Sequence, residues 1–149
     1  MSDVEGLPIL PLLERPFIIR IEMTTVVVAA AVVERDGRVL LTRRLEGTHL
    51  AGLWEFPGGK CEPGEALDVC LRRELREELA VEVVVGEELL STVHSYPERT
   101  VVIHFFTVRL LSDPTPQIGQ EMQWIRRDDL STLKLPPADD QLVALLQTR

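Results

Sequence analysis

The sequence predicts a single domain of the α/β (α+β) class, in which a mixed β-sheet is sandwiched between α-helices. The chain has 149 residues, a length that fits one domain of ordinary size. Stretches rich in Val, Ile and Ala, typical of buried strands, occur in both halves, and a periodic helix lies between them. Strands and helices do not alternate strictly, so a purely parallel sheet is not expected.

The first half of the chain begins with a buried strand over residues 26–33. Asp36-Gly37 is a hairpin signal, and residues 38–42 are expected to form the returning strand. The next features are, in order, a loop over 47–52, the segment 53–56, a break at 57–59, a turn at 62–65 and a helix over 66–79.

The second half contains three strands and a helix. They are, in chain order, strands over 81–93 and 100–111, a loop marked by Pro114 and Pro116, a short strand over 122–125, and a helix that Pro137 opens and that continues to residue 147. Three prolines interrupt residues 1–22, which we interpret as an N-terminal extension, packed on the surface or partly disordered. The domain is therefore expected over residues 23–149, and Met23 is an alternative start.

The composition excludes several classes of function. The net charge is −8, from 16 Lys and Arg against 24 Asp and Glu, which argues against stable binding of nucleic acid. No apolar stretch approaches the roughly 20 residues that span a bilayer. Cys61 and Cys70 form no C-x-x-C pair, so we expect neither a disulfide framework nor a zinc finger. These observations indicate a cytoplasmic protein with reduced cysteines and no membrane partner.

Acidic residues lie on and beside the apolar face of the helix over 66–79. At about 100° per residue, Glu74 and Glu78 point into the arc of the leucines, and Glu77 lies beside Glu74. The buried face is defined by Leu67, Cys70, Leu71, Leu75 and Leu79. Two unit charges about 5 Å apart repel by roughly 3 kcal/mol at an effective dielectric near 20. Such a cluster takes up protons or binds a cation, and carboxylates suit Mg²⁺ or Mn²⁺.

The residues around this helix complete a recognisable pattern. Residues 59–81 read G-K-C-E-P-G-E-A-L-D-V-C-L-R-R-E-L-R-E-E-L-A-V. This segment resembles the Nudix box, G-x5-E-x7-R-E-U-x-E-E-x-G-U, where U is an aliphatic residue. Ala80 replaces the last glycine, which puts the end of the helix in question and leaves the chemistry intact. The matching positions are Gly59, Glu65, Arg73, Glu74, Leu75, Glu77, Glu78 and Val81.

The resemblance extends to the MutT-type branch of the Nudix family over about residues 24–147. It is carried by T-R-R at 42–44, L-W-E-F-P-G-G-K at 53–60 and L-P-P-A-D at 135–139. It implies the Nudix fold and hydrolysis of a nucleoside triphosphate to the monophosphate and pyrophosphate. The implied role is sanitising the nucleotide pool, with 8-oxo-dGTP as substrate, in support of DNA repair. A neighbouring branch implies CTP or modified pyrimidine nucleotides instead.

The family also implies roles for individual acids. Glu74, Glu77 and Glu78 would hold Mg²⁺, or Mn²⁺, together with the carbonyl of Gly59, and Glu74 or Glu78 would help to deprotonate the attacking water. Arg73 would hold the catalytic loop through an ion pair with Glu65. Glu121 lies in a region that often supplies one more metal-binding acid.

Further residues are implied to contact the substrate. Arg44 and Lys60 match positions that touch phosphates or nucleotide, and Phe56 matches a base-stacking position. Asp139 stands where the bacterial prototype reads the base with an Asn. His49 is a weaker candidate from the residues alone. The expected partner is a small-molecule triphosphate, bound by a monomer or homodimer. A nucleotide-binding module that does not cleave its ligand is the alternative of another class.

Overall fold

The computed structural model describes residues 24–149, so the expected N-terminal extension over 1–22 lies outside the described residues. The strands are β1 (Thr24–Val32), β2 (Glu34–Arg35), β3 (Arg38–Arg43), β4 (Trp54–Glu55), β5 (Gly58–Lys60), β6 (Val83–Tyr96), β7 (Arg99–Leu110) and β8 (Met122–Arg126). The helices are α1 (Leu67–Leu79), α2 (Asp140–Gln147) and the 3-10 helices η2 (Arg127–Thr132) and η3 (Pro137–Asp139).

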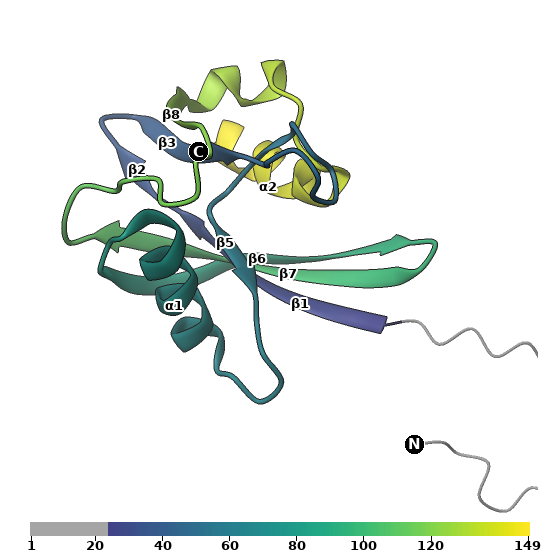
Figure 1. Cartoon of the computed structure of the whole chain (residues 1–149). Helices are drawn as coiled ribbons and strands as arrows, with labels where there is room; N and C mark the ends of the chain where they lie inside the picture. The colour runs from purple at the N-terminus through teal and green to yellow at the C-terminus, as the bar shows by residue number, and fades with distance from the viewer. Residues whose placement is uncertain (1–23) are drawn as a thin grey trace, which may run out of the picture.

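The strands form two four-stranded sheets (Figure 1). The first has the order β5-β1-β7-β6, with β1 parallel to β7 and the two edge strands antiparallel to their neighbours. The second is antiparallel, and its strand β3 pairs with β2, β4 and β8. The expected mixed sheet with flanking helices is therefore confirmed, and an antiparallel sheet is added to it.

Strand β1 lies between two hydrophobic cores because its side chains alternate across the sheet. Ala29 and Ala31 face the core that contains the buried leucines of α1. Ala30 and Val32 face the other core, which contains Leu142 and Leu146 of α2. The central sheet is thus covered on both faces, which explains why β1 reads as a continuous apolar segment.

Strand β5 forms where the sequence predicts only a break. Its residues pair antiparallel with β1, and Gly59 lies opposite Ala29. Gly58 has a φ of +155°, and a Cβ on it would come 2.1 Å from the carbonyl oxygen of Ala29. The glycine pair therefore permits two backbones to approach closely in a sheet. In the sequence, a glycine pair with this role cannot be told from one that marks a turn.

The predicted helix in the middle of the chain is confirmed as α1, and Ala80 ends it. Ala80 has φ 51° and ψ 40°, the left-handed conformation, and its N–H donates to the carbonyl oxygen of Arg76. The alanine thus adopts the conformation for which glycine is usually selected. At the C-terminus, Pro137 opens a 3-10 turn, and the α-helix itself begins at Asp140.

The expectation of two reduced cysteines is wrong, because a disulfide joins Cys61 to Cys70. The two residues are nine positions apart, and their Cα atoms are 5.3 Å apart. Spacing along the chain carries no sign of this pairing. It arises because the chain returns from β5 to α1, which brings the end of the strand beside the first turns of the helix.

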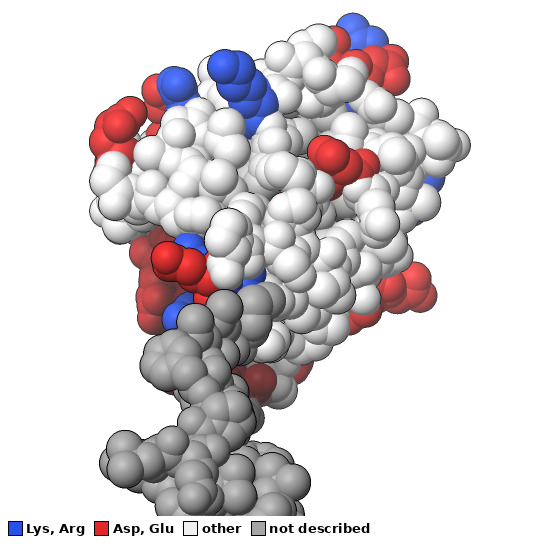
Figure 2. Space-filling view, turned by 90° about the vertical axis from the view of Figure 1, so that its right-hand side faces the viewer, with Lys and Arg blue, Asp and Glu red and all other residues white. Residues whose placement is uncertain are grey.

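Two further observations concern the surface. None of the helices in the described residues is both long enough and apolar enough to cross a bilayer. On the face of the molecule shown in Figure 2, charged side chains of both signs are scattered among uncharged residues. The net negative charge of the chain is therefore not gathered into one patch on this face.

Candidate active site

A cavity of about 440 Å³ opens beside β1, β5 and α1. It contains most of the site residues that the sequence predicts. Those that line it are Arg44, His49, Phe56, Gly59, Lys60, Glu74, Glu78 and Asp139. Glu65, Arg73, Glu77 and Glu121 are not among its lining residues. Arg73 contacts Glu74, which lines the cavity, and Glu77 contacts Arg73.

Gly59 and Glu74 are in close contact at the wall of this cavity. A Cβ on Gly59 would lie 2.3 Å from Cδ and 2.3 Å from Oε2 of Glu74. The carboxylate therefore occupies the space that a side chain at position 59 would need. The contact therefore packs β5 directly against α1 at the wall of the cavity.

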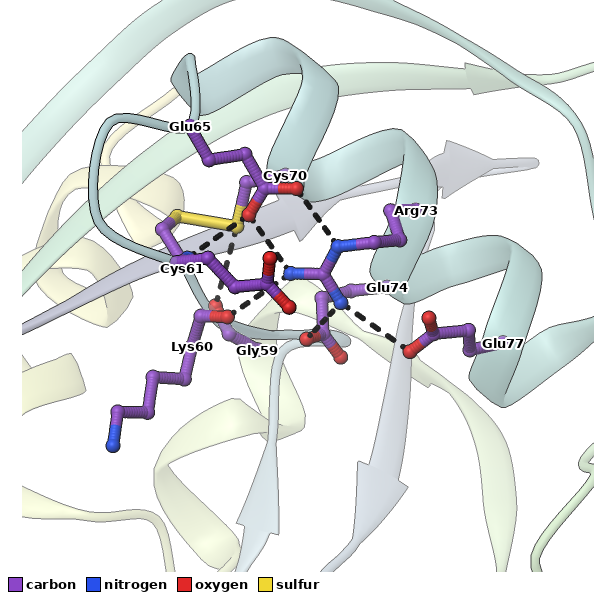
Figure 3. A network of polar contacts seen from close by, with 9 residues as sticks. Gly59, Lys60, Cys61, Glu65, Cys70, Arg73, Glu74 and Glu77 are labelled. Carbon is purple, nitrogen blue, oxygen red and sulfur yellow. Dashed lines mark hydrogen bonds and ion pairs between the residues drawn. A yellow bond between two sulfur atoms is a disulfide. The ribbon is translucent and has the colours of Figure 1, made fainter.

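Arg73 organises the acids around it (Figure 3). Its Nε and one terminal nitrogen donate to the two carboxylate oxygens of Glu65, at 2.8 and 2.9 Å. Its other terminal nitrogen donates to Glu74 at 3.0 Å and to Glu77 at 3.3 Å. A bond of 3.2 Å to the carbonyl oxygen of Lys60 ties in the end of β5. The expected ion pair between Arg73 and Glu65 is thus present, as a bidentate fork.

The acids differ in how their environment affects ionisation. Burial, together with the nearby carboxylates of Glu74 and Glu55, raises the pKa of Glu78 to about 8. Burial also raises the pKa of Glu74, against the opposing effect of Arg73. Hydrogen bonds from Arg73 and from the backbone of Glu62 lower the pKa of Glu65 to about 2. Glu78 therefore holds a proton near neutral pH, whereas Glu65 is a permanent anion paired with Arg73.

The donor atoms around Gly59 fit a hard divalent cation. They are the carboxylate oxygens of Glu74 and Glu78 and the carbonyl oxygen of Gly59, three residues that line the cavity. Glu77 lies on the exposed side of α1 and contacts Arg73. Mg²⁺ and Mn²⁺ prefer such oxygen ligands. A cation would also offset the burial and the carboxylate repulsion that raise the pKa of Glu78. The residues present therefore fit the metal that the sequence predicts.

Arg44 is held in the cavity wall by a residue to which the sequence assigned no role. Its guanidinium donates to Oε2 of Glu55 at 2.8 Å, and its Nε donates to the carbonyl oxygen of His49. Burial raises the pKa of Glu55, and Arg44 opposes this effect. A carboxylate between Trp54 and Phe56, in an otherwise apolar segment, is the signal that could have identified it.

Asp139 is the most deeply buried acid of the cavity, at 4% exposure. The turn η3 places it there, and the hydroxyl of Thr92 fixes that turn by donating to the carbonyl oxygen of Ala138 at 2.9 Å. Burial, with smaller effects of the Glu55 and Asp140 carboxylates, raises the pKa of Asp139 to about 8. Asp139 is therefore expected to be protonated at neutral pH, so that it can donate as well as accept a hydrogen bond.

Aromatic side chains contribute to the same cavity. Phe56 is buried and packs edge-on against Phe105, with ring centroids 5.9 Å apart. Tyr96 stands edge-on to His49 at 5.0 Å. Arg99 lines the cavity as well. Tyr96 and Arg99 could not be found from the sequence, because the turn between β6 and β7 alone brings them over the cavity.

Glu121 lies apart from these acids. Its carboxylate pairs with Arg43 at 3.2 Å, and its side chain is 58% exposed. A second, smaller hollow of about 130 Å³ is lined by Arg43 and Gln120, next to Glu78 and Glu55. The structure therefore does not bring Glu121 to the carboxylates of α1.

Comparison with known proteins identifies the class. A family model described as "NUDIX domain" matches residues 28–145. The chain therefore belongs to the Nudix family, and it has the α+β fold and the hydrolase relatives of that family.

Two relatives of this chain are named for hydrolysis of nucleoside triphosphates. A protein of Escherichia coli named "CTP pyrophosphohydrolase" is 38% identical over 122 residues, which are 81% of this chain and 90% of that protein. A protein of Haemophilus influenzae named "8-oxo-dGTP diphosphatase" is 34% identical over 118 residues, which are 78% of this chain and 87% of the other.

Solved structures agree with this placement. The solution structure of the E. coli ORF135 protein has a TM-score of 0.75 at 36% identity, and covers 85% of this chain and 91% of that chain. The crystal structure of the MutT protein from Methanosarcina mazei has a TM-score of 0.77 at 25% identity. The match covers 87% of this chain and 97% of that chain. The protein is thus a MutT-like Nudix hydrolase.

Proposed function

We propose that this protein hydrolyses nucleoside triphosphates to the monophosphate and pyrophosphate, with Mg²⁺ or Mn²⁺ held by Gly59, Glu74, Glu77 and Glu78. The observation that carries the proposal is the contact of Gly59 with Glu74 at the wall of a cavity that also contains Arg44, Lys60 and Asp139. A site for a cation and a site for a nucleotide therefore share one cavity. The free nucleotide pool on which such an enzyme acts places it in the cytoplasm.

The residues of the chain divide the work of hydrolysis among them. A divalent cation supplies positive charge beside the phosphates and makes water more acidic. Arg44 and Lys60 contact the phosphate oxygens from the cavity wall. Glu74 or Glu78 accepts the proton of the water that attacks the β-phosphorus, and the bond between that phosphorus and the bridging oxygen to the α-phosphate breaks. Arg73 and Glu65 keep the acids in place.

The base is read by Asp139, beside Phe56 and Tyr96. A protonated carboxyl can donate to a base oxygen or ring nitrogen and accept from an amino group. We propose 8-oxo-dGTP as the preferred substrate, which gives a role in keeping damaged nucleotides out of DNA. A cytosine nucleotide is the second candidate, because the relative named CTP pyrophosphohydrolase covers most of the chain.

The test is turnover of dGTP, 8-oxo-dGTP, CTP, dCTP and 5-methyl-dCTP with each metal, with separation of the products. We expect a monophosphate and pyrophosphate, and the highest kcat/KM for 8-oxo-dGTP. A preference for cytosine nucleotides would select the second candidate. Tight nucleotide binding without turnover under both metals would instead support a module that binds and does not cleave.

Two variants make the assay specific for the acids of α1. Glu77→Gln is expected to lose most of the activity while keeping the fold. Asp68→Asn is the matched control, because Asp68 lies on the exposed side of the same helix and pairs with Arg72 at 3.3 Å. Near-normal turnover of Glu77→Gln would remove Glu77 from the proposed ligands.

A further inference from the structure

The disulfide between Cys61 and Cys70 joins the end of β5 to the first turns of α1, the two elements that carry Gly59 and Glu74. We propose that this pair is a redox-modification site, oxidised by low-molecular-weight disulfides and reduced by dithiols, and that its oxidised form strengthens cation binding at Gly59. The redox chemistry does not depend on the proposed hydrolysis, whereas its effect on the cation rests on the proposed metal site.

The two cysteine residues differ in exposure. Cys61 is 9% exposed and Cys70 is 0% exposed. An external disulfide RSSR therefore meets the thiolate of Cys61, which attacks one sulfur of RSSR and releases the first RSH. Cys70 then attacks the sulfur of Cys61 in the mixed disulfide and releases the second RSH. Two protein thiols are oxidised, and one RSSR is reduced to two RSH.

The bond is one of the ties between α1 and the segment that precedes it, and Arg73 also donates to the carbonyl oxygen of Lys60. Cys70 holds the start of this segment through the disulfide, and Arg73 holds Glu65 through the fork described above. In the segment between Cys61 and Cys70, two hydrogen bonds link Glu62 and Glu65 in a turn. The N–H of Glu65 donates to the carbonyl oxygen of Glu62, and the N–H of Glu62 donates to the Glu65 carboxylate. Reduction removes the covalent tie and leaves only non-covalent contacts to hold the segment.

The redox state of Cys70 also affects the hydrogen bonding of the Gly59 carbonyl oxygen directly. Sγ of Cys70 lies 3.8 Å from this oxygen, within the range of a sulfur hydrogen bond. A reduced Cys70 thiol can donate its proton to the oxygen, which then has one lone pair fewer for a cation. In the disulfide, Cys70 has no proton to donate. Oxidation therefore removes a donor that competes with the cation for this oxygen and fixes β5 against α1, and both effects favour the cation.

The first experiment measures the redox reaction itself. The full chain is equilibrated in glutathione buffers of increasing oxidised fraction, its thiols are alkylated, and the product is weighed by mass spectrometry. We expect two alkylated thiols at the reducing end and none at the oxidising end. Cys61→Ser and Cys70→Ser should each keep one thiol that forms no intramolecular bond. Two thiols that persist in excess glutathione disulfide would overturn the proposal.

The second experiment measures the consequence for the site. Mn²⁺ is titrated into the oxidised and the reduced wild-type protein and followed by electron paramagnetic resonance, and the thermal midpoint is recorded for both forms. We expect the oxidised form to bind Mn²⁺ roughly fivefold more tightly, a typical size for coupling between two sites, and to unfold at a higher temperature. The wild-type chain serves for both forms, so the comparison does not depend on a variant that folds.

Controls separate the two contributions. Cys61→Ser/Cys70→Ser should respond to neither oxidant nor reductant, and Cys70→Ala should bind Mn²⁺ more tightly than the reduced wild type because it lacks the thiol proton. Equal Mn²⁺ affinity and equal midpoints of the two wild-type forms would overturn the proposed coupling. If neither form binds Mn²⁺, the proposed metal site fails, and the thiol count alone decides the redox reaction.

Discussion

Gly59 and Glu74 meet so closely that the carboxylate of Glu74 fills the place of a side chain at position 59. The contact packs the edge strand β5 against α1 at the cavity wall. Position 59 therefore requires glycine because there is no room for a Cβ. The backbone conformation of Gly59 is not the reason, since other residues can adopt it.

Gly59→Ala is expected to push the Glu74 carboxylate out of position. We expect activity and Mg²⁺ affinity to fall by about 10- to 100-fold, the usual effect of disturbing the groups that orient metal ligands. The measurement is kcat/KM as a function of Mg²⁺. Gly64→Ala is the control, because a Cβ there meets nothing within 4 Å and acts only through the backbone, at φ +77°. An equal loss in both variants would contradict the steric argument.

Arg73→Lys keeps the positive charge and removes the fork. A lysine cannot give two parallel hydrogen bonds to Glu65 and still reach Glu74. We expect a lower thermal midpoint and a loss of kcat/KM of at least about tenfold. Arg72→Lys is the matched control, since Arg72 pairs with Asp68 on the exposed side of α1. If Arg73→Lys behaved like the control, the charge alone would account for the role of Arg73.

Glu78 is expected to lose its proton when a cation binds, since burial and the nearby carboxylates raise its pKa to about 8. Mg²⁺ affinity should therefore rise with pH up to about pH 8 and then level off. Calorimetry in two buffers with different ionisation enthalpies measures the proton released. Glu78→Gln should release less. Proton release that is the same in this variant and in the wild type would assign it to another acid.

Asp139 links stability to pH. In the unfolded chain its pKa is near 3.8, and in the fold it is about 8, so the folded protein holds the extra proton between these values. The contribution of Asp139 to the free energy of unfolding is fully present below its unfolded-state pKa. It is lost as the pH rises through its folded-state pKa. We expect the thermal midpoint of the wild type to fall more steeply over this range than that of Asp139→Asn. Asp129→Asn, at an exposed acid, should keep the slope of the wild type.

Ala80 adopts a conformation that disfavours any residue with a Cβ. Ala80→Gly should raise the free energy of unfolding by about 1 kcal/mol, the usual cost of a left-handed alanine. Urea unfolding measures the change. Ala51→Gly serves as the comparison, since position 51 is not among the residues with positive φ, and there glycine should destabilise. An unchanged or lower stability of Ala80→Gly would show that the cap carries no strain.

Local spacing was enough to predict the helix and its acids. Glu74 and Glu78 lie on the cavity side of α1 because a period of 3.6 residues places them beside the leucines, and no other part of the chain is needed for that inference. The family pattern likewise predicted the pair of Arg73 and Glu65, because both lie in one short segment.

Tertiary structure alone decided which distant residues meet. Strand β5 depends on pairing with β1, and the bond between Cys61 and Cys70 depends on how β5 leads into α1. Glu55, Tyr96 and Arg99 face the acids of α1 only after two sheets and a hairpin have formed. Periodicity reports which face a side chain takes on its own element. The neighbour across the cavity is set by the packing of elements, which leaves no local signal in the chain.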